Sequence, residues 1–131
     1  MKQEKLIIVN LVKDLIVKID QNFINFPNKD IELKRSIKET ANSILLDIYI
    51  ANTSTNLEKR RDLQEGIIAK IKYLDFLVNF IYDKKIINAK KYLKFGEDLE
   101  YILKYVNGWK NKENKKIMEV DKQKNNIKIE N

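Results

Sequence analysis

Three consecutive basic residues, Lys59, Arg60 and Arg61, stand at the start of a long apolar-periodic segment of the 131-residue chain. Cationic side chains gathered in this way can hold the phosphate groups of a polyanion such as RNA or DNA. They can equally form an ordinary charged helix face, because Glu58 and Glu65 stand three and four residues from Arg61, where helical ion pairs form. Cations in the first turns of a helix oppose the helix dipole, so stability alone does not favour them there.

Further basic residues extend this candidate nucleic-acid-binding set along the same segment and into the connection after it. The set comprises Lys59, Arg60, Arg61, Lys70, Lys72, Lys84 and Lys85. Three more lysines follow the connection, at positions 90, 91 and 94. The whole chain has 26 basic and 19 acidic residues, which gives a net charge of +7 and a pI near 9.4. This balance suits a polyanionic partner.

The chain holds no cysteine and no histidine, which removes most catalytic and metal-binding chemistry. Disulfides, thiolate or imidazole zinc sites and Ser-His-Asp triads are excluded. The remaining Asp, Glu, Lys and Tyr residues show no spacing typical of a catalytic set. We therefore expect no enzyme activity, no metal and no cofactor, and the lack of cysteine fits a reducing compartment.

Length and composition predict one helical domain. Apolar residues make up 44% of the chain, enough for a core, whereas three glycines and one proline leave few sites for tight turns. The N-terminal segment begins like a signal peptide, but Asn10, Lys13 and Asp14 interrupt it and no small-residue cleavage site follows. No stretch approaches the ~18 uncharged apolar residues of a membrane span, so we expect a cytoplasmic protein without membrane contact.

Four segments with helical apolar periodicity predict an all-α fold. The predicted helices run over residues 4–21, 31–52, 56–82 and 89–107. Their apolar seams alternate spacings of three and four residues, the repeat of bundle packing. Short connections favour antiparallel neighbours, so the sequence predicts an antiparallel up-down-up-down four-helix bundle.

Residues at the ends of these segments predict where the helices begin and end. Pro27 breaks the chain before the second helix, and Gly108 is placed to end the fourth. The expected N-terminal caps are Asn28 or Asp30, Thr55 in a capping box with Glu58, and Asn88.

Composition changes after residue 109. Residues 110–131 hold seven basic and four acidic side chains, a net charge of +3, and few apolar residues. A segment this polar cannot bury enough surface to offset the entropy lost on ordering. The sequence therefore predicts a bundle over residues 1–109 with a net charge of +4, and a mobile tail over residues 110–131.

Apolar side chains outside the predicted seams indicate further packing. They are Leu6, Ile7, Val17, Leu46, Ile50, Tyr73, Phe76, Leu77 and Phe80. These side chains either widen the core or are buried between copies, and we expect a homo-oligomer. Tyr101, Tyr105 and Trp109 recur every four residues, which indicates packing against a neighbouring helix, with base stacking as the alternative.

Arg60 falls at the edge of the apolar seam of the third segment, beside Ile67 and Val78 on a helical wheel. A guanidinium at such a position needs a partner that satisfies its charge. A carboxylate, a contact in an oligomer and a bound anion are the three possibilities.

Several segments occur in an order that resembles a known family. They are FPxxDxxLKxxIxxxAxxIL from Phe26, AN from Ala51, EKRxxLQxxIIAKIKxLDFLxNxxYDKKII from Glu58, and KYLKFGxxLExILKYVxGW from Lys91. This pattern resembles the accessory variability determinant (Avd) proteins of diversity-generating retroelements. Broader relatives are the small four-helix-bundle proteins encoded in intervening sequences of bacterial 23S ribosomal RNA genes. The match covers about residues 26–109, and the first helix agrees in pattern only.

The resemblance implies a four-helix bundle that assembles into a pentameric barrel. It also implies a non-enzymatic helper that binds the reverse transcriptase of the retroelement, contacts RNA or DNA through basic surfaces, and supports mutagenic cDNA synthesis. Carried over to this chain, the basic positions are Lys59, Arg60 and Arg61, with Lys70 and Lys72 as weaker candidates.

An alternative follows from the modest charge of the predicted bundle. It is a stand-alone oligomer of the intervening-sequence type, with a protein partner and no nucleic-acid role. The two readings assign the run at 59–61 differently. In a monomer the run is best explained as a solvated face, whereas a ring would gather five copies of it into a polyanion site.

Overall fold

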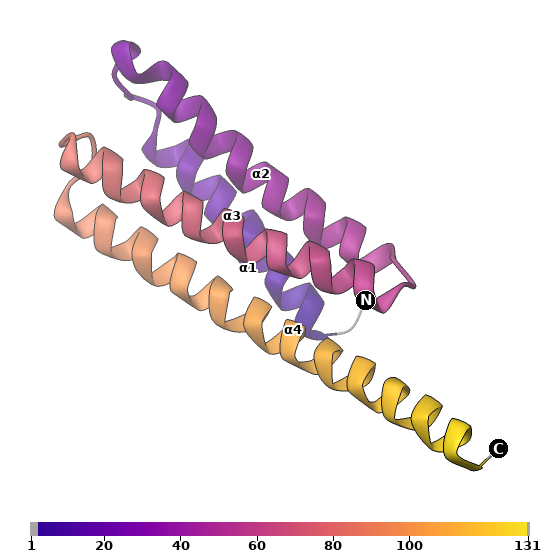
Figure 1. Cartoon of the computed structure of the whole chain (residues 1–131). Helices are drawn as coiled ribbons and strands as arrows, with labels where there is room; N and C mark the ends of the chain where they lie inside the picture. The colour runs from indigo at the N-terminus through magenta and orange to yellow at the C-terminus, as the bar shows by residue number, and fades with distance from the viewer. Residues whose placement is uncertain (1–2, 131) are drawn as a thin grey trace.

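The computed structural model describes residues 3–130, with side chains described from Lys5 to Asn126. Within these residues the chain forms four long α-helices and one short 3-10 helix (Figure 1). In chain order they are α1 (Gln3–Asn22), η1 (Asn28–Asp30), α2 (Ile31–Thr53), α3 (Leu57–Asp83) and α4 (Ala89–Glu130). The predicted all-α fold of four helices is confirmed. Residues 1 and 2 of the predicted bundle and residue 131 of the predicted tail lie outside the described residues.

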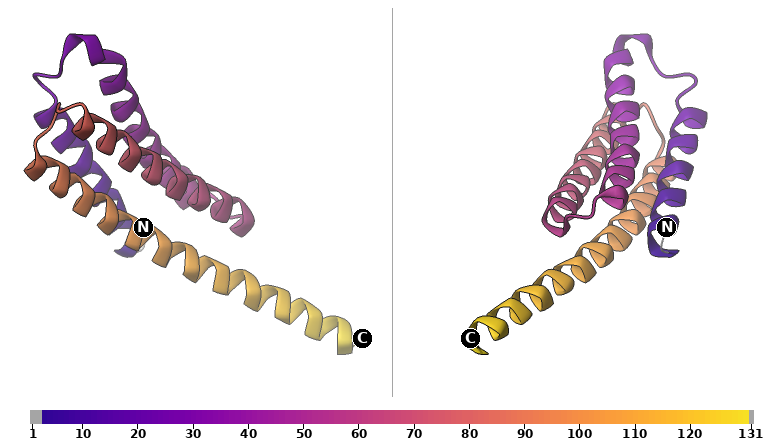
Figure 2. Two further views of the ribbon diagram at one scale, coloured as in Figure 1. Left: turned by 60° about the vertical axis from the view of Figure 1, so that its left-hand side comes forward. Right: turned by 90° about the vertical axis from the view of Figure 1, so that its right-hand side faces the viewer.

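Neighbouring helices run in opposite directions. The contacts within the pairs α2–α3, α3–α4 and α1–α4 show this: as residue numbers increase along one helix, the numbers of the residues they contact on the other helix decrease. These contacts are Asp47 with Lys70, Ala51 with Arg60, Asn79 with Tyr92, Glu113 with Arg60, Lys18 with Asp98, and Lys5 with Trp109. Helices α1 and α2 also pack together and are joined by a short connection. The arrangement is that of an up-and-down bundle (Figures 1 and 2).

The core follows the predicted apolar seams. Helix α2 buries Ile37, Ala41, Ile44, Ile48 and Ala51. Helix α3 buries, among its apolar residues, Ile67, Ile71, Leu74, Leu77, Val78 and Ile81. Spacings of three and four residues place these side chains on one side of each helix. Each large side chain buried in this way stabilises the fold by about 1.5–3 kcal/mol relative to its exposed state.

The start of α3 differs from the prediction by one residue. The side chain of Asn56, not Thr55, caps the helix, and its Oδ1 accepts a hydrogen bond of 3.1 Å from the backbone N–H of Lys59. The prediction of a Thr55 capping box is therefore wrong. Because α3 begins at Leu57, the N–H of Lys59 lies three residues after Asn56, within reach of its amide oxygen, and Asn is at least as good a cap as Thr.

The other predicted caps have mixed outcomes. Asn88 is confirmed at the start of α4, where its Oδ1 accepts a hydrogen bond of 2.9 Å from the N–H of Lys91. Asp30 stands at the N-cap position of α2 but makes no side-chain capping bond. Its carboxylate instead lies 2.9 Å from the Lys84 ammonium, which joins the α1–α2 connection to the end of α3.

Helix α4 continues through Gly108, so the predicted helix end at that residue is wrong. Within the described residues Lys85 has a positive φ and no glycine does, so Gly108 does not adopt the left-handed conformation of a helix-ending glycine. Trp109 is 3% exposed and Glu113 is 2% exposed, and both pack against the bundle one helical turn apart. Residues 110–130 therefore continue α4 where the sequence predicts a mobile tail. The last turns project beyond the other three helices (Figure 2).

Replacing Gly108 with alanine is expected to raise the free energy of unfolding by about 0.5–1 kcal/mol, because an interior helical glycine costs that much relative to alanine. A Cβ atom at Gly108 meets nothing within 4 Å, so no clash opposes the gain. A glycine that ended the helix in the left-handed conformation would give the opposite sign. Urea unfolding followed by far-UV circular dichroism measures the difference.

Most apolar side chains predicted outside the seams are exposed. They are Leu6, Val17, Leu46, Ile50, Tyr73, Phe76 and Phe80, with Ile7 half-buried. On α3 the ring centroids lie 6.3 Å apart between Tyr73 and Phe76, and 6.2 Å apart between Phe76 and Phe80. Leu77 is the exception. It is 4% exposed and widens the core, the first of the two predicted roles, because it lies three residues after Leu74 on the buried side of α3. The oligomer inferred from these side chains stays a prediction.

Candidate nucleic-acid interface

The predicted basic residues are distributed along α3 and the connection after it. Lys59 and Lys84 are 25 residues apart, which corresponds to about 37 Å along a helix. The run at 59–61 and the pair at 84–85 therefore lie at opposite ends of α3 (Figure 1). One copy of the chain does not bring the two groups onto one surface.

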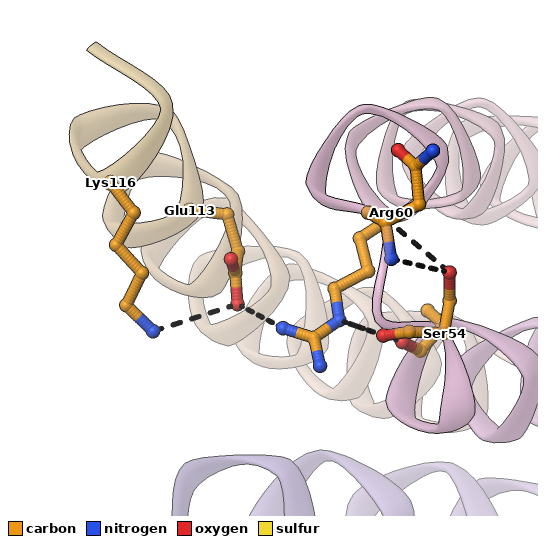
Figure 3. A network of polar contacts seen from close by, with 6 residues as sticks. Ser54, Arg60, Glu113 and Lys116 are labelled. Atoms are coloured by element: carbon orange, nitrogen blue, oxygen red, sulfur yellow. Dashed lines mark hydrogen bonds and ion pairs between the residues drawn. The ribbon is translucent and has the colours of Figure 1, made fainter. Parts of the chain in front are cut away.

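Arg60 is held by contacts within the chain (Figure 3). Its Nε donates hydrogen bonds to the backbone carbonyls of Ala51, at 3.1 Å, and Ser54, at 2.7 Å. Its Nη1 donates to Oε1 of Glu113 at 3.2 Å, and the Lys116 ammonium lies 3.9 Å from the same oxygen. Of the three possible partners for this guanidinium, the structure shows the carboxylate.

This arrangement gives Arg60 a structural task. It donates hydrogen bonds to carbonyl groups at the C-terminal end of α2, where no backbone N–H of the same helix is left to bond them. It also neutralises a carboxylate that is almost wholly buried on α4. Arg60 thus joins the end of α2, the start of α3 and the part of α4 beyond Gly108. Because its Nε and Nη1 are engaged within the chain, it is a poorer candidate for a phosphate contact than the sequence indicates.

Two further predicted residues are also paired within the chain. The Lys70 ammonium donates to the Ser43 hydroxyl at 2.6 Å and lies 2.5 Å from Oδ2 of Asp47 on α2. The Lys84 ammonium, which pairs with Asp30, lies 5.4 Å from the centroid of the Phe80 ring. Both lysines are consequently poorer candidates for a phosphate contact than the sequence indicates.

The other four predicted residues have no ion pair with any side chain in the described part of the protein. Lys59, Lys72 and Lys85 are exposed, and Arg61 is half-buried. Lys72 borders a cavity of about 460 Å³ between α3 and α4 whose acidic lining is Asp75, Glu97 and Glu100. This surplus of carboxylates disfavours a phosphate at Lys72. Lys59, Arg61 and Lys85 remain the better candidates.

A denser basic surface lies where α3 passes into α4. Residues 84–94 contain five lysines and no acidic residue. Lys84 pairs with Asp30, and Lys94 lies 3.5 Å from Asp98. Three exposed lysines remain without an ion pair among the described side chains, and we term them the lysine end: Lys85, Lys90 and Lys91.

A cavity of about 280 Å³ opens beside the lysine end, between α1 and α4. It is lined by Lys18, Asn22, Asn88, Lys90, Lys91, Lys94, Phe95 and Asp98. One carboxylate, Asp98, faces these four lysines and pairs with Lys18 at 2.9 Å. The positive charge that is left over, together with two amide side chains, suits an anionic group.

The lysine end lowers the stability of the fold in two ways. Lys85 has a φ of 63°, a left-handed conformation in which glycine is the least strained residue. The first turn of α4 holds lysines and no acidic residue, against the preference set by the helix dipole. Stability therefore does not explain why lysine occupies these positions.

Only part of this surface belongs to the predicted basic set. Lys84 and Lys85 are in that set, whereas the lysines at positions 90, 91 and 94 are not. The signal that marks the surface is the run of eleven residues, 84–94, with five lysines and no carboxylate. What the sequence could not show is that Lys18 and Asn22 of α1 join the same end of the bundle.

The described part of the chain contains no cluster of three acidic side chains arranged to hold a metal ion. None of the helices in residues 3–130 is long and apolar enough to cross a membrane. No protein-family model, curated protein sequence or solved structure matches the chain significantly. The four-helix fold agrees with the resemblance drawn from the sequence, and the family itself stays a prediction.

Proposed function

We propose that this chain is a non-enzymatic binding module whose lysine end contacts the phosphate backbone of RNA or DNA. The observation that carries the proposal is the lysine end itself. Lys90 and Lys91 stand in the first turn of α4, where the helix dipole adds positive potential, and Lys85 lies in the connection just before it; all three are exposed and without ion pairs among the described side chains. Lys59 and Arg61, at the far end of α3, supply a second and weaker basic surface.

The resemblance to Avd proteins supplies the biological setting of this proposal. Phosphate contacts hold a nucleic acid without reading its sequence. That property suits a helper of a reverse transcriptase that supports mutagenic cDNA synthesis, because the product varies in sequence. A ring of five copies, which the resemblance also implies, stays a prediction. The protein partner is tested by searching the neighbourhood of its gene for a reverse transcriptase and by co-purifying that enzyme with this chain; a neighbourhood without one would count against the proposal.

Replacing Lys85, Lys90 and Lys91 together with alanine is expected to weaken binding to single-stranded RNA and DNA and to reduce its salt dependence. Each phosphate contact contributes about 0.7 to the slope of log affinity against log salt for single strands, so the loss of three contacts lowers the slope by about 2. Fluorescence anisotropy of a labelled oligonucleotide across a salt series measures the slope.

The matched control replaces three lysines elsewhere with alanine and so removes the same charge: Lys13 on α1, Lys34 on α2 and Lys104 in a later part of α4. This control should change the slope by less than half as much as the lysine-end variant does. A second comparison replaces Lys59 and Arg61 but leaves Arg60, so that the structural contacts of Arg60 are kept. Equal effects in the two triple variants would show that net charge, and not the lysine end, sets the affinity.

One observation favours the second candidate function, a stand-alone oligomer with a protein partner. Arg60, Lys70 and Lys84, three of the seven predicted basic residues, are paired inside the chain, while aromatic side chains on α3 are exposed. Under this alternative the wild-type protein would bind no oligonucleotide even at low salt.

A further inference from the structure

The side of α3 that faces away from the core carries an ordered row of side chains. Successive members are three or four residues apart, which places them on one side of the helix. We term this row the outer strip; it consists of Glu58, Asp62, Gly66, Ala69, Tyr73, Phe76, Phe80 and Lys84. All are exposed except Gly66, which is half-buried.

Packing within one copy does not explain the outer strip. Tyr73, Phe76 and Phe80 are 50%, 58% and 43% exposed, which is a large apolar surface for a single helix to leave in water. Gly66 lies inside the same helix, where glycine is unfavourable, yet a Cβ atom there meets nothing within 4 Å. The small residue is therefore not required by any neighbour within the chain.

The order of the outer strip is symmetric in position, and three of its four symmetric pairs are complementary in character, Asp62 and Phe80 being the exception. Residues equally distant from position 71 form the pairs Glu58 and Lys84, Asp62 and Phe80, Gly66 and Phe76, and Ala69 and Tyr73. The outermost pair joins an acid to a base. The two inner pairs each join a small residue to an aromatic one. A helix with this order matches a second copy of itself that runs antiparallel to it.

We propose that a second copy of this chain packs its α3 antiparallel against α3, on the outer strip, with a two-fold axis beside position 71. Phe76 of each copy then lies over Gly66 of the other, and Tyr73 lies over Ala69. Lys84, which also pairs with Asp30 of its own copy, then lies beside Glu58 of the other copy at each end of the contact. A parallel pairing is disfavoured because it sets Glu58 against Glu58 and Asp62 against Asp62.

Helix α2 adds apolar surface beside the small residues. Because Asp47 contacts Lys70 and Ala51 contacts Arg60, Ile50 of α2 lies level with the stretch of α3 that contains Gly66. Ile50 is 38% exposed. A ring of the second copy that lies over Gly66 is therefore bordered by an aliphatic side chain, which extends the buried apolar contact.

This contact is independent of the proposed function and is an alternative to the ring of five. A two-fold contact uses the same strip on both copies and is satisfied by a pair, whereas a ring of five needs two different surfaces on each copy. The two arrangements predict different masses for the same chain. Light scattering separates them.

The first test measures the mass of the full chain, 15.6 kDa per copy, by light scattering over a range of concentrations. The wild type should form a dimer. Phe76→Ser and Gly66→Leu should each weaken the dimer by roughly tenfold or more, since both act at the centre of the contact. Gly66→Leu removes no contact and improves helix propensity, so circular dichroism should show an intact fold.

The matched control is Tyr101→Ser, which removes a ring that is 49% exposed on α4 and should leave the dimer unchanged. A wild-type monomer, a ring of five, or equal weakening by Phe76→Ser and Tyr101→Ser would each overturn the proposal.

A second test determines the direction of the contact, and the lack of cysteine in the chain makes it clean. Glu58→Cys and Lys84→Cys proteins are prepared separately, mixed, and treated with a short bismaleimide reagent. In the antiparallel pair, position 58 of one copy lies beside position 84 of the other, while the two positions 58 are about 39 Å apart. Cross-linked heterodimers are expected. Cross-linked homodimers, or no cross-linked product, would overturn the antiparallel contact.

Discussion

Replacing Arg60 with alanine is expected to lower the free energy of unfolding by roughly 3 kcal/mol, because it leaves the Glu113 carboxylate buried without its main partner. Glu113 is 2% exposed, and its Oε2 already lacks a hydrogen-bond partner among the described atoms. The variant also loses the two hydrogen bonds from Nε to the carbonyls at the end of α2. Lys116, 3.9 Å from the carboxylate, offsets only part of the loss. Urea denaturation at a fixed protein concentration measures the change.

The neighbouring residue provides the control for this prediction. Arg61 is half-buried, and no ion pair joins it to any side chain described between Lys5 and Asn126. Arg61→Ala should therefore change stability by less than about 0.5 kcal/mol. The double variant Arg60→Met, Glu113→Leu removes both charges at once and should recover most of the loss, because a buried pair can be replaced by apolar side chains at little cost. Equal small effects at 60 and 61 would show that both arginines belong to a solvated face.

Replacing Trp109 with alanine is expected to lower the free energy of unfolding by roughly 3–5 kcal/mol, the usual cost of removing a large buried aromatic side chain. Trp109 is 3% exposed and lies one residue beyond the position where the sequence predicts the end of the fourth helix. The Lys5 ammonium lies 5.8 Å from the centroid of its ring, so the variant also loses a contact between α1 and α4. Thermal and urea unfolding should both report the change.

Tyr101→Ala is the comparison for this second prediction. Tyr101 stands eight residues earlier on α4, is 49% exposed, and meets Tyr105 edge to face with ring centroids 5.2 Å apart. Its removal should cost no more than about 1 kcal/mol. A loss below that value for Trp109→Ala would mean that α4 does not pack against the bundle beyond Gly108.

The four helices could be predicted because their apolar periodicity is a local property of the sequence. Every seam residue of α3 from Ile67 to Ile81 is buried, and Asn88 caps α4 as expected. The cap of α3 was harder to predict because Thr55 and Asn56 are adjacent and both can cap. Only the exact first residue of the helix decides between them.

The continuation of α4 could not be predicted because it depends on contacts between distant segments. Polar composition and Gly108 together indicate a helix end when the chain is considered alone. Arg60 is 53 residues away from Glu113 in sequence, and their ion pair lies beside the buried Trp109 one turn earlier on α4. A favourable tertiary contact of this kind overrides local propensity.

The candidate interface was predicted in part, for a similar reason. A basic residue is recognisable in a sequence, but its pairing with a carboxylate on another helix is not. The pairing of Lys70 with Asp47 and of Lys84 with Asp30, which makes both lysines poorer candidates, exists only once the helices are assembled. The density of lysines in residues 84–94, by contrast, is a local property that the sequence shows directly.

The length of α4 changes how this protein must be studied in solution. Its 42 residues correspond to about 63 Å, whereas a compact domain of this size has a radius of gyration of about 14 Å. An elongated particle diffuses more slowly and elutes earlier from a sizing column than a sphere of equal mass. Column retention would therefore overstate the mass of a monomer, so the number of copies is best counted by a method that does not depend on shape.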